Sequence, residues 1–366
     1  MTRVVITGVG ALSPLGVTRE ALWHGVLEGR TGIRTIDVQG EVTSGGPVAI
    51  DGDRRVANHA IDAALAAAKR DAHDTGFIWG TGLDTYERAN GLVHRSAGSC
   101  FSALAQRFAS PRRMIAVACA TGTAAIGEAF RLVRAGRADA CVAGGSSVML
   151  GPFYVMGFHA LRAVAVDVAG EPASTVCKPF DRKRRGFALA NGAGALVVES
   201  LASAERRGVT PIAELVGYGA SQDAFDLNRP PTDGAGAQLA MERALADAKL
   251  APRDVHAVNA HGTGTLAGDI AEAAALRTVF GRVPVSSIKG AIGHTMAAAG
   301  ALEAIVALET CRTGIVPATT NLDEPDDACA LDHVIGRPRA CDASRVISTS
   351  FGMGGQNAAI ILERFA

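Results

Sequence analysis

Met114–Ala125, MIAVACATGTAA, joins an apolar, β-leaning run to a helical pattern, and the rest of the chain is organised around it. The run ends at Cys119, and the small residues after it open a helix that continues to Ala135. This order predicts a strand, a turn that carries the cysteine, and a helix whose positive end faces the thiol. A thiol placed there favours the thiolate, which is the form that attacks carbonyl carbons. A lone cysteine in such a run is more often an inert small hydrophobe, so the function depends on what accompanies it.

Short β-branched runs that end near glycine recur along the chain and alternate with helical patterns. This alternation predicts an α/β fold. Five such runs in each half predict an internal duplication, with halves at 1–205 and 206–366 and with helices between and outside two packed sheets. The expected strands are Arg3–Gly10, Phe77–Gly82, Met114–Cys119, Asp139–Gly145 and Gly194–Glu199, then Ile212–Gly219, Ala257–Gly264, Val283–Gly290, Arg345–Gly352 and Asn357–Glu363.

Composition excludes several functional classes. The chain has 366 residues, more than one hydrophobic core usually serves, and its 36 acidic and 36 basic residues balance. Nothing therefore favours nucleic acid or an anionic membrane as a partner. The seven cysteines are scattered without a CxxC pair, and no apolar run is long enough for a signal peptide or a membrane span. We expect a cytoplasmic protein with reduced thiols and no metal site.

Two histidines lie in turns similar to the one that carries Cys119. His261 follows an apolar run in NAHGTGT, and His294 follows another in SSIKGAIGHT. Each histidine taken singly is more often structural. Together with Cys119 they predict strand ends that converge on one pocket. A fourth turn, SFGMGGQN at 350–357, offers backbone N–H groups that could bind an oxyanion.

These four segments resemble those of the β-ketoacyl-acyl carrier protein synthases of the I/II type, which have a Cys-His-His triad. The resemblance runs from Val4–Gly10 to the C-terminus, and four motifs in the right order make it specific where Gly-Met-Gly-Gly alone would be weak. It implies a thiolase-like, duplicated five-layer α/β/α/β/α fold with two mixed five-stranded sheets. It also implies decarboxylative Claisen condensation of an S-acyl cysteine with malonyl-acyl carrier protein, in fatty-acid or polyketide-type biosynthesis.

The resemblance gives a role to each residue of the expected triad. Cys119 resembles the nucleophile that takes the acyl chain from a carrier-protein thioester. His261 and His294 resemble the pair that binds the malonyl thioester carbonyl and stabilises the enolate. Lys289 resembles the lysine that supports the histidines, with Glu303 as a plausible charge partner. Neutral imidazoles suit this chemistry because they donate hydrogen bonds without a fixed charge.

The resemblance also implies a substrate channel. The backbone N–H groups of Cys119 and Phe351 resemble the oxyanion hole, and Phe351 with Gly352 resembles the turn that gates the acyl pocket. Thr263 and Thr265 resemble the threonines that bind the phosphopantetheine arm. We expect no resident cofactor, because phosphopantetheine arrives on the acyl carrier protein. The expected partners are that carrier protein, acyl and malonyl thioesters, and a second subunit in a homodimer or heterodimer.

The sequence departs from the family at four places. The stretch 61–114, which usually supplies part of the dimer interface and of the acyl-pocket floor, is short. Arg185 and Asn191 stand at positions that usually hold acids, and Met353 stands where an aromatic residue is common. The basic run Arg182–Arg185 is either solvated surface or a docking site for an acidic partner.

Several alternatives follow from these features. The short stretch motivates a condensing subunit that works as a heterodimer with an inactive, chain-length-factor-like partner. A non-catalytic scaffold homologue would typically lack the cysteine that this chain retains. A thiolase would carry a second cysteine in the C-terminal glycine turn, and Cys341 lies outside it. The III type of synthase pairs its cysteine with His and Asn, and Gly293-His294-Thr295 argues against it.

Overall fold

The computed structural model describes residues 2–81, 86–89, 92–95 and 100–366. Its main element is an eleven-stranded mixed sheet in the order β15-β13-β12-β17-β18-β11-β1-β10-β8-β4-β7. Each of the ten predicted strands has a counterpart in it, although Gly82 lies outside the described residues. The strands predicted at Ala257–Gly264 and Val283–Gly290 end earlier, at Asn259 and Ser286. The bounds are β1 (Val4–Leu12), β4 (Gly76–Thr81), β7 (Arg112–Ile115), β8 (Ala140–Ser147), β10 (Gly192–Ser200), β11 (Ala213–Gln222), β12 (Ala257–Asn259), β13 (Pro284–Ser286), β15 (Asp332–His333), β17 (Arg345–Gly352) and β18 (Gln356–Arg364).

The two halves of the sheet have the same topology, which confirms the duplicated α/β fold. Numbered within each half, both run in the order 3-2-4-5-1, as β7-β4-β8-β10-β1 and β13-β12-β17-β18-β11. Strands 1, 5 and 4 are antiparallel neighbours in both halves, and strands 4, 2 and 3 are parallel. The two expected five-stranded sheets are joined where β1 pairs with β11, at Val5↔Glu214 and Ile6↔Ala213.

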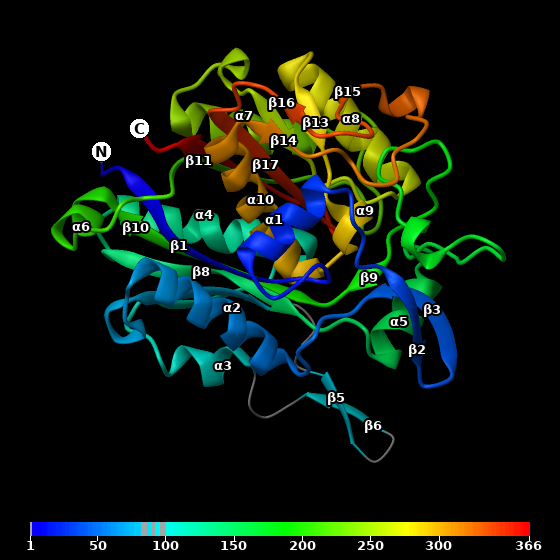
Figure 1. Cartoon of the computed structure of the whole chain (residues 1–366), viewed down its shortest axis with the longest axis horizontal. Helices are drawn as coiled ribbons and strands as arrows, with labels where there is room; N and C mark the ends of the chain where they lie inside the picture. The colour runs from blue at the N-terminus through cyan, green and yellow to red at the C-terminus, as the bar shows by residue number, and fades with distance from the viewer. Residues whose placement is uncertain (1, 82–85, 90–91, 96–99) are drawn as a thin grey trace.

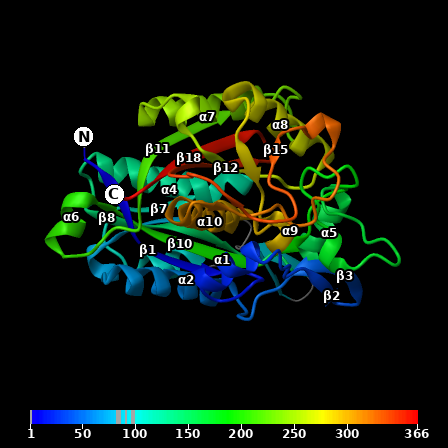
Figure 2. The same cartoon turned by 45° about the horizontal axis from the view of Figure 1, so that its top comes forward.

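Helices form three layers around these half-sheets. The buried helices α4 (Thr121–Arg134) and α10 (Ala299–Thr313) lie between them, α2 (Asp53–Ala68) covers the first half, and α7 (Ala235–Ala248) and α8 (Leu266–Phe280) cover the second (Figures 1 and 2). Gly10 and Gly219 let the outer helices approach equally closely, because a Cβ on either would lie 2.0 Å from the carbonyl oxygen of Ala60 or Ala240.

Smaller elements complete the chain. A three-stranded sheet, β2-β3-β9, packs beside the helix α5 (Figure 1). Within the described residues no helix combines the length and the apolar character needed to cross a membrane. The short 61–114 stretch is described only in part, because 82–85, 90–91 and 96–99 lie outside the described residues. The bounds are α1 (Arg19–Leu27), β2 (Arg34–Val38), β3 (Glu41–Gly46), β5 (Tyr86–Ala89), β6 (Leu92–Arg95), α3 (Cys100–Ala105), α5 (Pro152–Ala160), β9 (Leu189–Ala190), α6 (Leu201–Arg206), α9 (Lys289–Ile292), β14 (Ile315–Val316) and β16 (Arg339–Ala340).

Candidate active site

Cys119 lies in a tight turn between β7 and α4. The strand ends at Ile115, earlier than predicted, and a single 3₁₀ turn, Ala118–Ala120, carries the cysteine into the helix. Ala118 has a φ of +49°, in the left-handed region that side chains other than glycine rarely adopt. The Thr121 hydroxyl accepts the Val117 N–H at 2.8 Å, which holds this turn. The strained turn therefore fixes the position of the sulfur.

The environment of the Cys119 sulfur differs from the sequence expectation. Burial raises the pKa of its thiol to about 11, while the Lys289 charge and the backbone N–H groups of Met353 and Cys119 oppose that rise. Burial outweighs these opposing contributions, so the thiol is the favoured form at neutral pH, contrary to the expectation of a favoured thiolate.

His261 follows β12, and its ring is oriented by a buried lysine. Nζ of Lys289 lies 3.2 Å from Nδ1 of His261, donates to the His261 carbonyl oxygen and forms an ion pair with Glu303. Because an ammonium can only donate, Nδ1 is the acceptor and the ring carries its proton on Nε2. The Ser350 hydroxyl donates to Glu303 at 3.4 Å, which ties this pair to β17.

His294 follows α9, and its ring is oriented in the same way by different partners. Nδ1 accepts the Met296 N–H at 3.3 Å, so its proton also lies on Nε2. The backbone N–H of His294 donates to Ala188 at 2.7 Å. Within the described residues, Nε2 of His294 is buried and has no hydrogen-bond partner. An unsatisfied buried donor is costly, and here it is available to a ligand.

The structure brings Cys119, His261 and His294 together. Their sulfur and ring-nitrogen atoms lie within 4.8 Å of one another, and the two rings cross at 82° with centroids 5.4 Å apart. Burial lowers the pKa of both histidines well below its usual value, and the Lys289 charge lowers it further. The rings are therefore neutral donors at neutral pH. A metal ion would need the Nε2 lone pairs, and both hydrogen-bond arrangements place a proton there instead.

Two buried acids that sequence reasoning missed hold the His261 turn. Glu272 accepts the N–H groups of His261 and Gly262 at 2.8 and 2.7 Å. Asp269 accepts those of Thr263 and Gly264 at 3.0 and 3.1 Å. Burial raises the pKa of Glu272 to about 7 and that of Asp269 to about 6. A local signal was present, because acids three residues apart in the first turns of α8 share one helix face beside the histidine turn.

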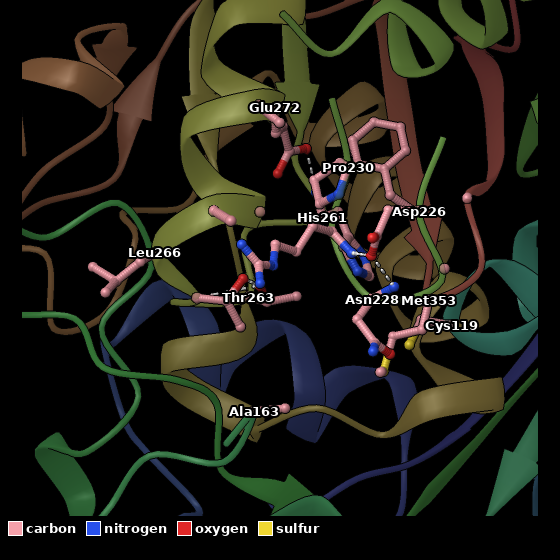
Figure 3. A pocket seen from close by; sticks show the side chains of 18 of the residues that line it. Cys119, Ala163, Asp226, Asn228, Pro230, His261, Thr263, Leu266, Glu272 and Met353 are labelled. Carbon is pink, nitrogen blue, oxygen red and sulfur yellow. Dashed lines mark hydrogen bonds between the residues drawn. The ribbon is translucent and has the colours of Figure 1, made fainter. Parts of the chain in front are cut away.

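A cavity of about 450 Å³ connects the triad to the surface. It is lined by Cys119, both histidines, Thr263, Thr265, Phe351 and Gly352. Figure 3 shows Cys119, His261 and Thr263 among its lining residues. The Thr263 and Thr265 hydroxyls lie 2.9 Å apart. The Phe351 ring packs on the His261 ring, with centroids 5.8 Å apart.

The C-terminal glycine turn places a backbone N–H at the Cys119 sulfur, from a residue that the sequence analysis did not single out for this contact. Met353, two residues beyond Phe351, has the backbone N–H that faces the Cys119 sulfur, and Figure 3 shows the two residues side by side. The resemblance implies instead that the backbone N–H of Phe351, with that of Cys119, forms the oxyanion hole. Register within a glycine-rich turn is hard to read from sequence, because each glycine permits another path for the backbone.

Arg185 and Asn191, which stand at positions where acids are usual, both make hydrogen bonds in this structure. The Asn191 amide oxygen accepts the N–H groups of Met149 and Leu150 at 2.6 and 3.1 Å, so a neutral acceptor stands where the family usually has an acid. Arg185 donates to the Val166 carbonyl at 2.8 Å and forms an ion pair with Glu171.

The basic run is not uniform. The Arg184 side chain is fully buried, lies 2.6 Å from Asp326 and also faces Asp269, so this member of the run is structural. Arg182 is exposed, and Arg185 lines the mouth of the cavity.

Comparison with known proteins agrees with this geometry. The description "Beta-ketoacyl synthase, N-terminal domain" matches residues 1–58 and 49–204, and "Beta-ketoacyl synthase, C-terminal domain" matches 212–323. The chain belongs to the β-ketoacyl synthase family. It is therefore a condensing enzyme of the acyltransferase class.

Curated members of this family match along their whole length. The 3-oxoacyl-[acyl-carrier-protein] synthase 2 of Staphylococcus aureus is 33% identical over 415 residues, covering 99% of this chain and 98% of that protein. The synthase 2 of Synechocystis is 32% identical over 410 residues, with the same coverage. Both alignments are longer than the 366 residues of this chain, so these β-ketoacyl synthases carry residues that this chain lacks.

Solved structures of β-ketoacyl synthases superimpose over the full length of both chains. A ketosynthase solved with its type II polyketide acyl-carrier protein and bound to a hexaketide has a TM-score of 0.91 at 27% identity. A β-ketoacyl synthase from Burkholderia phymatum has a TM-score of 0.88 at 30% identity, and the ishigamide ketosynthase/chain length factor has 0.88 at 28%. The thiolase-like architecture is confirmed.

Proposed function

We propose that this chain condenses an acyl thioester with a malonyl thioester carried on acyl carrier protein, with loss of CO₂. The observation that carries the proposal is the buried Nε2 of His294, which has no partner among the described residues, while His294 lies in one cluster with the His261 ring and the Cys119 sulfur. In the first step the thiol attacks the acyl carbonyl, a C–S bond forms, and the carrier's thiol leaves with the proton. The backbone N–H groups of Cys119 and Met353 face that sulfur, which supports them as the oxyanion hole.

The second step uses the two imidazoles. The Nε2–H groups of His261 and His294 donate to the carbonyl oxygen of the malonyl thioester. As CO₂ leaves, the electron pair of the broken C–C bond moves into the enolate, whose oxygen these donors stabilise. The enolate carbon then attacks the S-acyl carbonyl, a C–C bond forms, and the C–S bond to Cys119 breaks. Cys119 leaves as the thiolate and takes up one proton.

Burial, with the charge of Lys289 adding to it, explains why both rings stay neutral. Loss of hydration disfavours a positive charge on either ring, and the cation close to His261 acts in the same direction. Neutral rings can donate hydrogen bonds to an enolate. A charged imidazolium would instead bind the malonyl carboxylate as a counter-ion and oppose the loss of CO₂. The cavity supports the rest of the assignment, with the hydroxyls of Thr263 and Thr265 placed for the phosphopantetheine arm.

A second candidate is the same reaction in a heterodimer with an inactive homologue. Two observations favour it: the chain is shorter than its curated relatives, and one structural neighbour is a ketosynthase/chain length factor. In addition, among the described residues β7 lies at the edge of the sheet, and Arg112–Met114 on it are exposed. A strand edge without a neighbour in the described part of the chain can pair with a second subunit.

The deciding experiment uses the full chain, purified alone and then mixed with an acyl carrier protein. Incubation with acyl-carrier protein should add the mass of the acyl group at Cys119, and malonyl-carrier protein should then release CO₂ and give a β-ketoacyl product. Acylation at another residue, or none with any acyl donor, would refute the proposal. Activity of the chain alone as a homodimer would remove the need for a heterologous partner.

A further inference from the structure

Cys119 packs against buried side chains that do not line the cavity. Cys119 belongs to a buried cluster with Met149, Val155 and Met296, and of these four only Cys119 lines the cavity. The sulfur of Met296 lies 3.7 Å from the sulfur of Cys119. Cys119 therefore belongs both to the cavity lining and to a buried cluster whose methionine and valine side chains do not line the cavity.

An acyl group on Cys119 cannot remain in the entrance cavity. The second substrate must bring its malonyl thioester to the two histidines, and both histidines line that same cavity. The acyl chain therefore has to lie on the other side of the sulfur. Met296 contacts the sulfur, does not line the cavity and is almost fully buried.

The backbone of Met296 is fixed while its side chain can adapt. Its φ of +46° lies in the left-handed region, its N–H donates to His294 at 3.3 Å, and the next N–H, of Ala297, donates to Ser147 at 3.1 Å. The thioether has three rotatable bonds and fills irregular spaces, so it can change rotamer without moving the backbone.

Other residues of the same buried cluster are held more firmly than the Met296 side chain. The Phe187 ring packs edge-on against His294, with centroids 4.9 Å apart, and against Phe158 at 5.9 Å. The backbone of Met149 is held by the Asn191 amide.

We propose that Met296 sets the length of the acyl group that Cys119 accepts. A short acyl group fits with the thioether in place, and a longer chain enters only when that side chain moves aside. This inference rests on the proposed function and deepens it, because it names the residue that selects among acyl thioesters. It also means that the free-energy cost of binding a long acyl chain comes from displacing one side chain of the cluster.

Three variants of the full chain test the proposal. Met296→Ala removes the obstruction, Met296→Leu keeps a side chain of similar volume, and Met241→Ala deletes a buried methionine from a different core cluster as the matched control. Acetyl, hexanoyl and decanoyl thioesters of an acyl carrier protein serve as donors. The measured quantity is the ratio of decanoyl to acetyl acylation rates at Cys119, read by intact-protein mass spectrometry.

We expect Met296→Ala to raise that ratio by about tenfold or more, since a few methylene groups in an apolar pocket discriminate by at least this factor. Met241→Ala should leave the ratio near the wild-type value, and Met296→Leu, which keeps the volume but is less adaptable, should not raise it. Malonyl decarboxylation, measured as CO₂ release, reports whether the Met296 substitution has disturbed His294. An unchanged ratio in Met296→Ala, with acetyl transfer and decarboxylation intact, overturns the role of Met296. Failure of the wild-type chain to accept any acyl group would instead refute the proposed function.

Discussion

Nζ of Lys289 lies 3.2 Å from Nδ1 of His261, and this contact fixes which ring nitrogen carries the proton. The same ammonium is paired with Glu303 in the buried interior. One cation therefore orients the His261 ring, adds to the burial that keeps both rings uncharged, and neutralises a buried acid. Removing it should affect chemistry and stability together, and the two effects can be separated.

Lys289→Ala should lower malonyl decarboxylation by on the order of 100-fold or more, because the donor on His261 loses its fixed tautomer. It should also destabilise the fold by about 3–5 kcal/mol, since Glu303 is left buried without its partner. The double variant Lys289→Met/Glu303→Gln removes both charges and should recover stability without recovering CO₂ release. The exposed Lys249→Ala is the control. Normal decarboxylation in folded Lys289→Ala would show that the tautomer argument is wrong.

Cys119→Ala should abolish acyl-enzyme formation while changing the free energy of unfolding by no more than about 1–2 kcal/mol. Cys177 offers a matched control, because it is buried in the same cluster and lies outside the cavity lining. Cys177→Ala should acylate at the wild-type rate. Intact-protein mass spectrometry after incubation with acyl-carrier protein distinguishes the two variants. A persistent acyl adduct on Cys119→Ala would place the nucleophile elsewhere.

The pKa of Cys119, raised to about 11 by burial, predicts a steep pH dependence of alkylation in the absence of substrate. Below that value the thiolate fraction rises with pH, so the iodoacetamide rate should increase about tenfold per pH unit throughout the neutral and mildly alkaline range. An unperturbed thiol would begin to level off near about pH 8.5. The rate is measured as loss of the free Cys119 peptide, with Cys119→Ala defining the background. A plateau near neutral pH would mean that the thiolate is favoured after all.

Glu272→Gln should slow condensation by displacing the His261 turn. The carboxylate accepts two backbone N–H groups, and an amide replaces one acceptor oxygen with a donor that faces one of them. We expect a loss of about 1–3 kcal/mol in stability, with reduced CO₂ release in the folded fraction. Glu242→Gln, at an exposed position on α7, should change neither quantity. Thermal unfolding and CO₂ release are measured on the same samples, and equal behaviour of the two variants would exclude a positioning role for Glu272.

Much of this architecture could be predicted from the order of residues alone. Ten strands, their arrangement in two equivalent halves and the turns that carry Cys119, His261 and His294 all follow from local patterns, because strand alternation and glycine turns are properties of neighbouring residues. The end of β7 was less predictable. The left-handed Ala118 interrupts a run that otherwise reads as continuous strand.

What only the tertiary structure decided concerns contacts between residues that are distant in the chain. Whether Cys119 rests as a thiol depends on how much water the packed cluster excludes, and no local pattern reports that. The Met353 N–H at the sulfur and the Met296 thioether behind it come from segments more than 170 residues away. The sequence determined which chemical groups are present and the kind of turn each occupies. The folded packing determined their protonation, their hydrogen-bond partners and the space left for a substrate, because desolvation and contact are properties of the assembled interior.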